Sequence, residues 1–96
     1  MQARHDGGVR LRVLIGERVT LKFQVDNIEG KDFTISNAQY TVKIGDVVEN
    51  SGTMTIDGHE LSFLFNPTKA GYYSIEVMYD IGTDRRKSRF PIEVVE

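Results

Sequence analysis

Few residues of this chain have the type and the spacing that catalysis requires. A serine-histidine-aspartate site needs a positioned histidine. The two histidines are His5, near the N-terminus, and His59, which follows Asp57-Gly58 and is expected to be an exposed imidazole. No serine stands in a Gly-x-Ser-x-Gly motif, and the chain has no cysteine, which excludes disulfides, thiolate ligands and cysteine nucleophiles. The sequence therefore predicts that the protein is not an enzyme and uses no cofactor.

An acidic segment from Asp26 to Asp32 offers oxygen atoms of the kind that calcium prefers. An EF-hand loop requires acidic or amide side chains at its first, third and fifth positions. Counted from Asp26, the third and fifth positions are Ile28 and Gly30. Because the spacing fails, we interpret the segment as a polar loop between strands and expect no metal site.

The densest group of charges contains four cations within five residues: Arg85, Arg86, Lys87 and Arg89. Such a cluster suits a phosphate group or an acidic protein surface. Alternatively, the cluster lies on an edge strand, where charged side chains prevent pairing with other chains. No aromatic residue interrupts the cations, so base stacking on nucleic acid is not expected. Alternation along a strand places Arg85, Lys87 and Arg89 on one outward face, where they form a candidate interaction surface.

Tyr72 belongs to the same candidate surface because it is the tyrosine expected to point outward. The other three, Tyr40, Tyr73 and Tyr79, fall on inward positions. Leu14 and Val95 are also expected to point outward, and they could form a small interface patch.

Apolar residues recur at every second position in short segments, which is the period of a strand with one buried face. Hairpin turns are expected at Gly45-Asp46 and at Asp57-Gly58, the latter of type I′. A change of parity predicts a bulge at Ser36-Asn37, and Gly52 is expected to break a strand. Pro91 cannot donate to a ladder, so the last strand should be an edge or pair on one side only. This punctuation predicts an all-β protein of seven or eight strands, with the core Val19, Leu21, Phe23, Val25, Ala38, Tyr40, Val42, Leu61, Phe63, Tyr73, Ile75, Val77, Phe90 and Ile92.

Gly71, Tyr73 and Ile75 resemble the tyrosine corner of immunoglobulin-type β-sandwiches, in which the tyrosine hydroxyl bonds back to upstream backbone. The segment Gly16–Phe23 resembles strand B of the same fold. The resemblance implies an antiparallel Ig-like β-sandwich of about seven strands without a disulfide. Phe23 and Ile75 would occupy the places where many family members carry the inter-sheet disulfide.

The length supports one domain, which we assign to residues 9–96, after a tail at 1–8 that we expect to be disordered. The tail is polar and lacks the apolar core of a signal peptide, and no apolar segment is long enough to span a membrane. The net charge of −2 gives no general attraction to nucleic acid or anionic lipid. We therefore expect neither a membrane nor a nucleic acid as partner.

A longer pattern over about Gly16 to Val95, including Phe65-Asn66-Pro67-Thr68 and Tyr79-Asp80-Ile81-Gly82, is similar to the small Ig-like domains of tailed-phage and prophage virion proteins, such as tail, baseplate and neck components. This resemblance implies a structural module that binds copies of itself or other virion subunits, in the virion or in the host cytoplasm during assembly. The alternative is a ligand- or glycan-binding module of a bacterial surface or secreted protein, which would use Tyr72 and loop residues.

Overall fold

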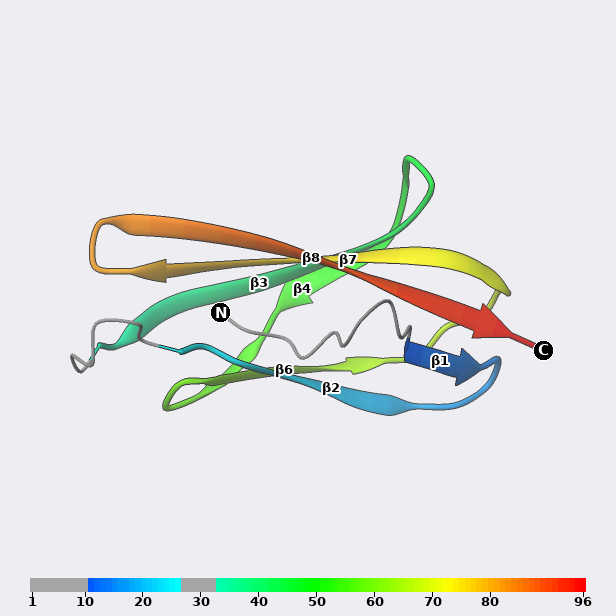
Figure 1. Cartoon of the computed structure of the whole chain (residues 1–96), viewed down its shortest axis with the longest axis horizontal. Helices are drawn as coiled ribbons and strands as arrows, with labels where there is room; N and C mark the ends of the chain where they lie inside the picture. The colour runs from blue at the N-terminus through cyan, green and yellow to red at the C-terminus, as the bar shows by residue number, and fades with distance from the viewer. Residues whose placement is uncertain (1–10, 27–32) are drawn as a thin grey trace.

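The computed structural model describes residues 11–26 and 33–96, and this part of the chain forms eight β-strands (Figure 1). The strands are β1 (Leu11–Leu14), β2 (Val19–Gln24), β3 (Ile35–Ile44), β4 (Val47–Thr53), β5 (Thr55–Asp57), β6 (Glu60–Phe65), β7 (Gly71–Ile81) and β8 (Asp84–Val95). The expected tail, the first residues of the expected first strand and the loop at 27–32 lie outside the described residues.

The strands form two sheets, one with the order β1-β8-β7-β3-β4 and one with the order β2-β6-β5. Strand β1 pairs in parallel with β8, and all other pairs are antiparallel. Figure 1 shows β3, β7 and β8 in one layer and β2 and β6 in the other. The predicted antiparallel sandwich without a disulfide is confirmed, with eight strands.

Three two-residue turns join neighbouring antiparallel strands, and each begins with a glycine. Gly45, Gly58 and Gly82 have φ angles of 58°, 61° and 59°, and no other residue type has positive φ in the described ranges. A glycine with positive φ followed by a residue with negative φ is the pattern of a type II′ turn. The type I′ turn expected at Asp57-Gly58 is therefore wrong: Asp57 pairs with Glu60, and the loop is Gly58-His59.

Gly52 lies inside β4 and does not break it, contrary to expectation. A Cβ atom at Gly52 would lie 3.0 Å from the hydroxyl of Tyr40, whose ring crosses the strand at this point. A glycine at this position leaves room for the Tyr40 side chain to lie close against the backbone. The break falls instead at Met54, where the chain passes from the larger sheet to the smaller one and buries the methionine side chain.

The bulge predicted at Ser36-Asn37 is confirmed by a register shift between Ile35 and Asn37 where β3 pairs with β7. The prediction for Pro91 holds only in part. Strand β8 is not an edge, because β1 pairs with it from Ile92 onward. Before Ile92, the pairing of β8 among the described residues is with β7 alone, so Pro91 lies where the ladder is one-sided.

The predicted core is buried between the sheets, with Phe23 between Phe63 and Phe90 at ring-centroid distances of 6.3 and 4.8 Å. Ile75 is also buried, so the two disulfide-replacing residues both face inward. Three predicted members are only partly buried at the margin: Val19, Tyr40 and Phe90. The core further includes residues that the sequence-based set omits: Val13, Ile35, Met54, Phe65, Tyr79 and Val94.

Candidate interaction surface

The tyrosine corner determines how β7 begins and therefore where Tyr72 points. The Tyr73 hydroxyl donates to the backbone oxygen of Lys69 at 2.8 Å, as predicted. Gly71 starts the strand with a φ of 146°, a conformation that residues with a Cβ rarely adopt. Since Tyr73 is buried, strand alternation sends Tyr72 to the outer face, where 64% of it is exposed.

The structure brings Tyr72, Arg85, Lys87 and Arg89 to the same outer face of the five-stranded sheet. Tyr72 lies directly opposite Glu93 of β8, and the three cations occupy alternate positions of the same strand. Arg89 lies opposite Glu76, which is four positions from Tyr72 along β7, or roughly 13 Å at the rise of an antiparallel strand.

Two of the three predicted cations are paired with carboxylates, which the sequence did not predict. Arg85 lies opposite Asp80 and donates to both carboxylate oxygens, at 2.9 and 3.2 Å. Arg89 lies opposite Glu76 and donates to it at 3.1 Å. Directly opposite residues of unlike charge attract one another across a sheet, so this part of the surface is largely neutralised.

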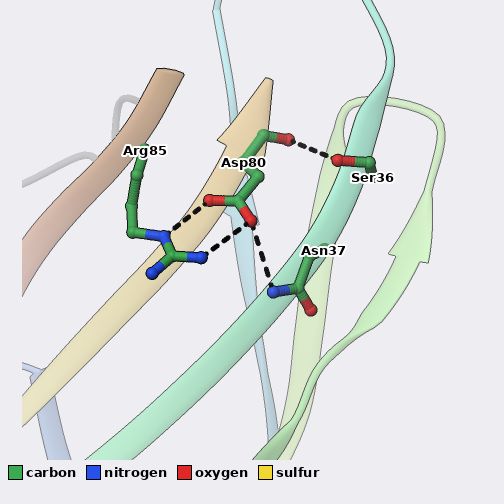
Figure 2. A network of polar contacts seen from close by, with 4 residues as sticks. All are labelled: Ser36, Asn37, Asp80 and Arg85. Carbon is green, nitrogen blue, oxygen red and sulfur yellow. Dashed lines mark hydrogen bonds and ion pairs between the residues drawn. The ribbon is translucent and has the colours of Figure 1, made fainter. Parts of the chain in front are cut away.

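Asp80 is the centre of a small polar network that ties three strands together (Figure 2). Besides Arg85 of β8, its carboxylate accepts from the side-chain amide of Asn37 at 3.4 Å, and its backbone oxygen accepts from the hydroxyl of Ser36 at 3.4 Å. The β3 bulge allows these consecutive residues to reach the same partner. The hydrogen bonds from Arg85 hold the pKa of Asp80 below its ordinary value, although partial desolvation opposes them.

Lys87 lies between these two ion pairs and opposite Met78. No carboxylate in the described part of the chain forms an ion pair with it. The remaining member of the basic cluster, Arg86, lies opposite buried Tyr79 and so occupies the other face of β8. Lys87 is therefore the cation of this cluster best placed to meet an acidic partner.

Apolar side chains surround Tyr72 on the outer face, and we call the set Tyr72, Leu14, Val95 and Pro91 the Tyr72 patch. Pro91 and Val95 flank the residue opposite Tyr72, and Leu14 pairs with Val95 across β1 and β8. Leu14 is 50% exposed, as expected for an outward residue. The patch also encloses an ion pair in which Arg12 donates to Glu93 at 3.0 Å.

His59 is held in place and is not the exposed imidazole that the sequence suggested. Its ring stacks on Phe33 with centroids 3.9 Å apart, and its Nε2 lies 2.9 Å from the Phe33 backbone oxygen. Because a carbonyl oxygen only accepts, Nε2 carries the proton. The backbone oxygen of His59 in turn accepts from the amide of Val25, so His59 has a structural role.

No group of three potential metal-ligating side chains occurs within 11–26 and 33–96. The same ranges contain no helix long and apolar enough to cross a membrane.

No protein-family model matches the chain, and no curated protein is significantly similar to it in sequence. Solved structures do share its fold. An engineered protein matches with a TM-score of 0.72 at 15% identity, covering 95% of this chain and 19% of that one. Domains 4 and 5 of the S-layer protein SbsC match with a TM-score of 0.60 at 24% identity, and the match covers 94% of this chain and 49% of that one. A protein from Bacteroides vulgatus described as a glycoside hydrolase matches with a TM-score of 0.57 at 22% identity, and the match covers 91% of this chain and 17% of that one.

The chain thus spans less than half the length of each of these proteins. At such identities the likeness establishes the fold class alone, a β-sandwich that occurs as one unit within larger chains. A sandwich of this kind hosts many unrelated functions, so function must be inferred from the residues on its surface.

Proposed function

We propose that this protein is a non-catalytic interaction module that binds another protein through the Tyr72 patch. The observation that supports this most directly is the exposure of Tyr72, 64%, on the same outer sheet face as the half-exposed Leu14. Tyrosine is enriched among the residues that dominate binding energy, because its large ring loses little conformational freedom when it is buried.

The charges near the patch suit the rim of an interface. Arg12–Glu93 and Arg89–Glu76 are pre-formed ion pairs whose arginine side chains are exposed, so their effect on affinity is expected to be small. Lys87 retains a charge for a partner's carboxylate, which would steer association and set orientation more than affinity. A partner surface with an apolar pocket and an acidic group roughly 20 Å away would complement both features.

The resemblance to tailed-phage virion domains supports a role in a particle, in which the partner is a further copy or another virion subunit. The S-layer domains of the same fold also support a structural role, at a cell surface. A glycan-binding module acting through Tyr72 is the alternative. We favour protein as the partner because Tyr72 stands on a sheet face with leucine, valine and proline around it.

Replacing Tyr72 with alanine tests the proposal, with Leu64→Ala as the matched control. Leu64 is 53% exposed and lies on the outer face of the opposite sheet. Sedimentation velocity of the chain, alone and mixed with the products of neighbouring genes, should show association that Tyr72→Ala weakens by about tenfold or more. Leu64→Ala should bind as the unaltered protein does. Equal binding by Tyr72→Ala, or a loss in Leu64→Ala alone, would exclude the Tyr72 patch.

The charged part of the surface needs a separate variant. Replacing Arg85, Lys87 and Arg89 together with serine should leave the melting temperature nearly unchanged, because exposed ion pairs contribute little to stability. Association should weaken, and Lys87→Ser alone should account for most of that effect. Unfolding of the triple variant would show that the ion pairs are part of the fold. Undiminished association of Lys87→Ser at low salt would show that the partner does not contact this cation.

A further inference from the structure

A hollow of about 180 Å³ opens at the edge of the sandwich, between β4 and the loop that follows β6. Its floor is apolar and buried, and it includes Val42 of β3, Phe65 at the end of β6, and Pro67. Its rim is polar. Tyr72 does not line the hollow, so the hollow and the Tyr72 patch are separate features of the surface.

A second bulge, which the sequence did not reveal, supplies one side of the rim. Val48 pairs with Lys43 and Asn50 pairs with Val42, which leaves Glu49 as the extra residue of β4. Bulges of this kind redirect side chains. Here Asn50 lies opposite an inward-facing valine, and both Asn50 and its neighbour Glu49 line the hollow.

The tyrosine corner holds the other side of the rim. The Tyr73 hydroxyl fixes the backbone at Lys69, and the Lys69 ammonium lies 3.4 Å from a carboxylate oxygen of Glu49, which lines the hollow. The loop that carries Asn66 and Thr68 is therefore attached to β7 at one end and to β4 by an ion pair. This arrangement positions polar groups before any ligand arrives, which lowers the entropy lost on binding.

Several of these polar groups have unused hydrogen-bonding capacity. The side chains of Asn66 and Thr68 have no hydrogen-bonding partner within the described part of the chain. Asn50 accepts from the amide of Ser51 through its side-chain oxygen, and its NH₂ group remains available. Donors and acceptors therefore surround an apolar floor.

We infer that the hollow is a binding subsite for a single uncharged, polyhydroxylated six-membered ring, that is, a pyranose residue of a glycan. The volume is slightly above the roughly 150 Å³ that accommodates benzene, so the hollow can receive one ring whose hydroxyl groups project toward the opening. The C–H face of the sugar would contact Phe65 and Pro67, and its hydroxyls would bond Asn66 and Thr68. The charge of Glu49, the acidic residue that lines the hollow, is neutralised by its ion pair with Lys69, so the site favours a ligand without net charge.

An NMR titration of the intact chain with single neutral sugars (glucose, galactose, mannose, rhamnose and N-acetylglucosamine) tests the inference. At least one sugar should shift backbone amide signals at residues 49, 50, 66, 68 and 69, with a dissociation constant on the order of millimolar, as expected for one ring. Combined Asn66→Ala and Thr68→Ala should weaken binding about tenfold, because two ligand hydrogen bonds are lost. Both side chains are exposed, so the melting temperature of this variant should not change.

Tyr72→Ala is the control and should bind the sugar like the unaltered protein, even where it loses its protein partner. The absence of shifts with every sugar at about 100 mM, far above the expected dissociation constant, would overturn the inference. So would unchanged binding by the Asn66 and Thr68 variant, or shifts centred on the Tyr72 patch. A response to sugar acids alone would overturn the assignment of an uncharged ligand.

Discussion

Replacing Tyr73 with phenylalanine isolates the tyrosine-corner hydrogen bond, because the ring and its packing are kept. The ring is 4% exposed and meets Phe65 edge to face at a centroid distance of 5.5 Å. The variant loses only the hydroxyl that donates to the Lys69 backbone oxygen at 2.8 Å. A typical intramolecular hydrogen bond contributes about 0.5–1.5 kcal/mol. Lys69 lies in an exposed loop, so water can replace the lost donor, and we expect a cost of about 1 kcal/mol.

The assay is thermal and urea-induced unfolding, with Tyr79→Phe as the matched control. A loss of about 1 kcal/mol lowers the melting temperature of a domain of this size by about 4–8 °C. Tyr79 lies on the same strand and is 3% exposed, but its hydroxyl has no hydrogen-bonding partner among the described residues. Its replacement should change the melting temperature little. Equal effects of the two variants would refute the role assigned to the corner.

The pH dependence of the stability is a second test of the role of the Tyr73 hydroxyl. Burial raises the pKa of Tyr73, so above about pH 10 the unfolded chain loses this proton before the folded chain does. The stability contributed by the protonated hydroxyl is present below that pH and declines as the pH rises through the folded pKa. Tyr73→Phe lacks this decline, so the difference in melting temperature between the two proteins should narrow in alkali. A difference that widens in alkali would contradict this sign.

Particular contacts give three further predictions. Gly52→Ala should destabilise the protein by about 1–2 kcal/mol in urea unfolding, because the new Cβ meets the Tyr40 ring. The same substitution should cost less in a protein that also carries Tyr40→Leu, and additive effects of the two substitutions would exclude the contact. Arg85→Ser should raise the pKa of Asp80, measured by NMR titration, and an unchanged pKa would contradict the network of Figure 2. In the unaltered protein, the stability that this ion pair adds at neutral pH should vanish as the pH falls through the lowered pKa of Asp80. Phe23→Ala should cost about 3–5 kcal/mol, measured by the same urea unfolding, and a cost under about 1 kcal/mol would place this ring outside the core.

The sequence predicts the fold well wherever the signal is local. Strict alternation from Val19 to Val25 is enough to define which face of β2 is buried, because successive side chains of a strand point in opposite directions. Two of the errors in the fold concern glycine, at the turn Asp57-Gly58 and at Gly52. Gly52 was expected to be a break because glycine weakens strands in general, whereas the cause here is the Tyr40 ring, and Tyr40 lies on another strand.

For the surface residues, the sequence predicted which side chains point outward but not which partners they contact. Alternation correctly places Arg85 and Arg89 outward, but their partners, Asp80 and Glu76, depend on the register between β7 and β8. A shift of one residue in that register would have sent the same cations to the other face, beside the core. The neutralised character of the surface is therefore a property of the pairing between strands.

Taken alone, the sequence determined the strands, their buried faces and the tyrosine corner, because these depend on residues within a few positions of one another. The tertiary structure alone decided that the Tyr72 patch combines residues of β1, β7 and β8, and that Glu49 and Asn66 border one hollow. Those pairs are distant in the chain, and only the ladder register and the packing of the two sheets bring them together. Contacts across a sandwich depend on the positions of both layers, and no local pattern encodes them.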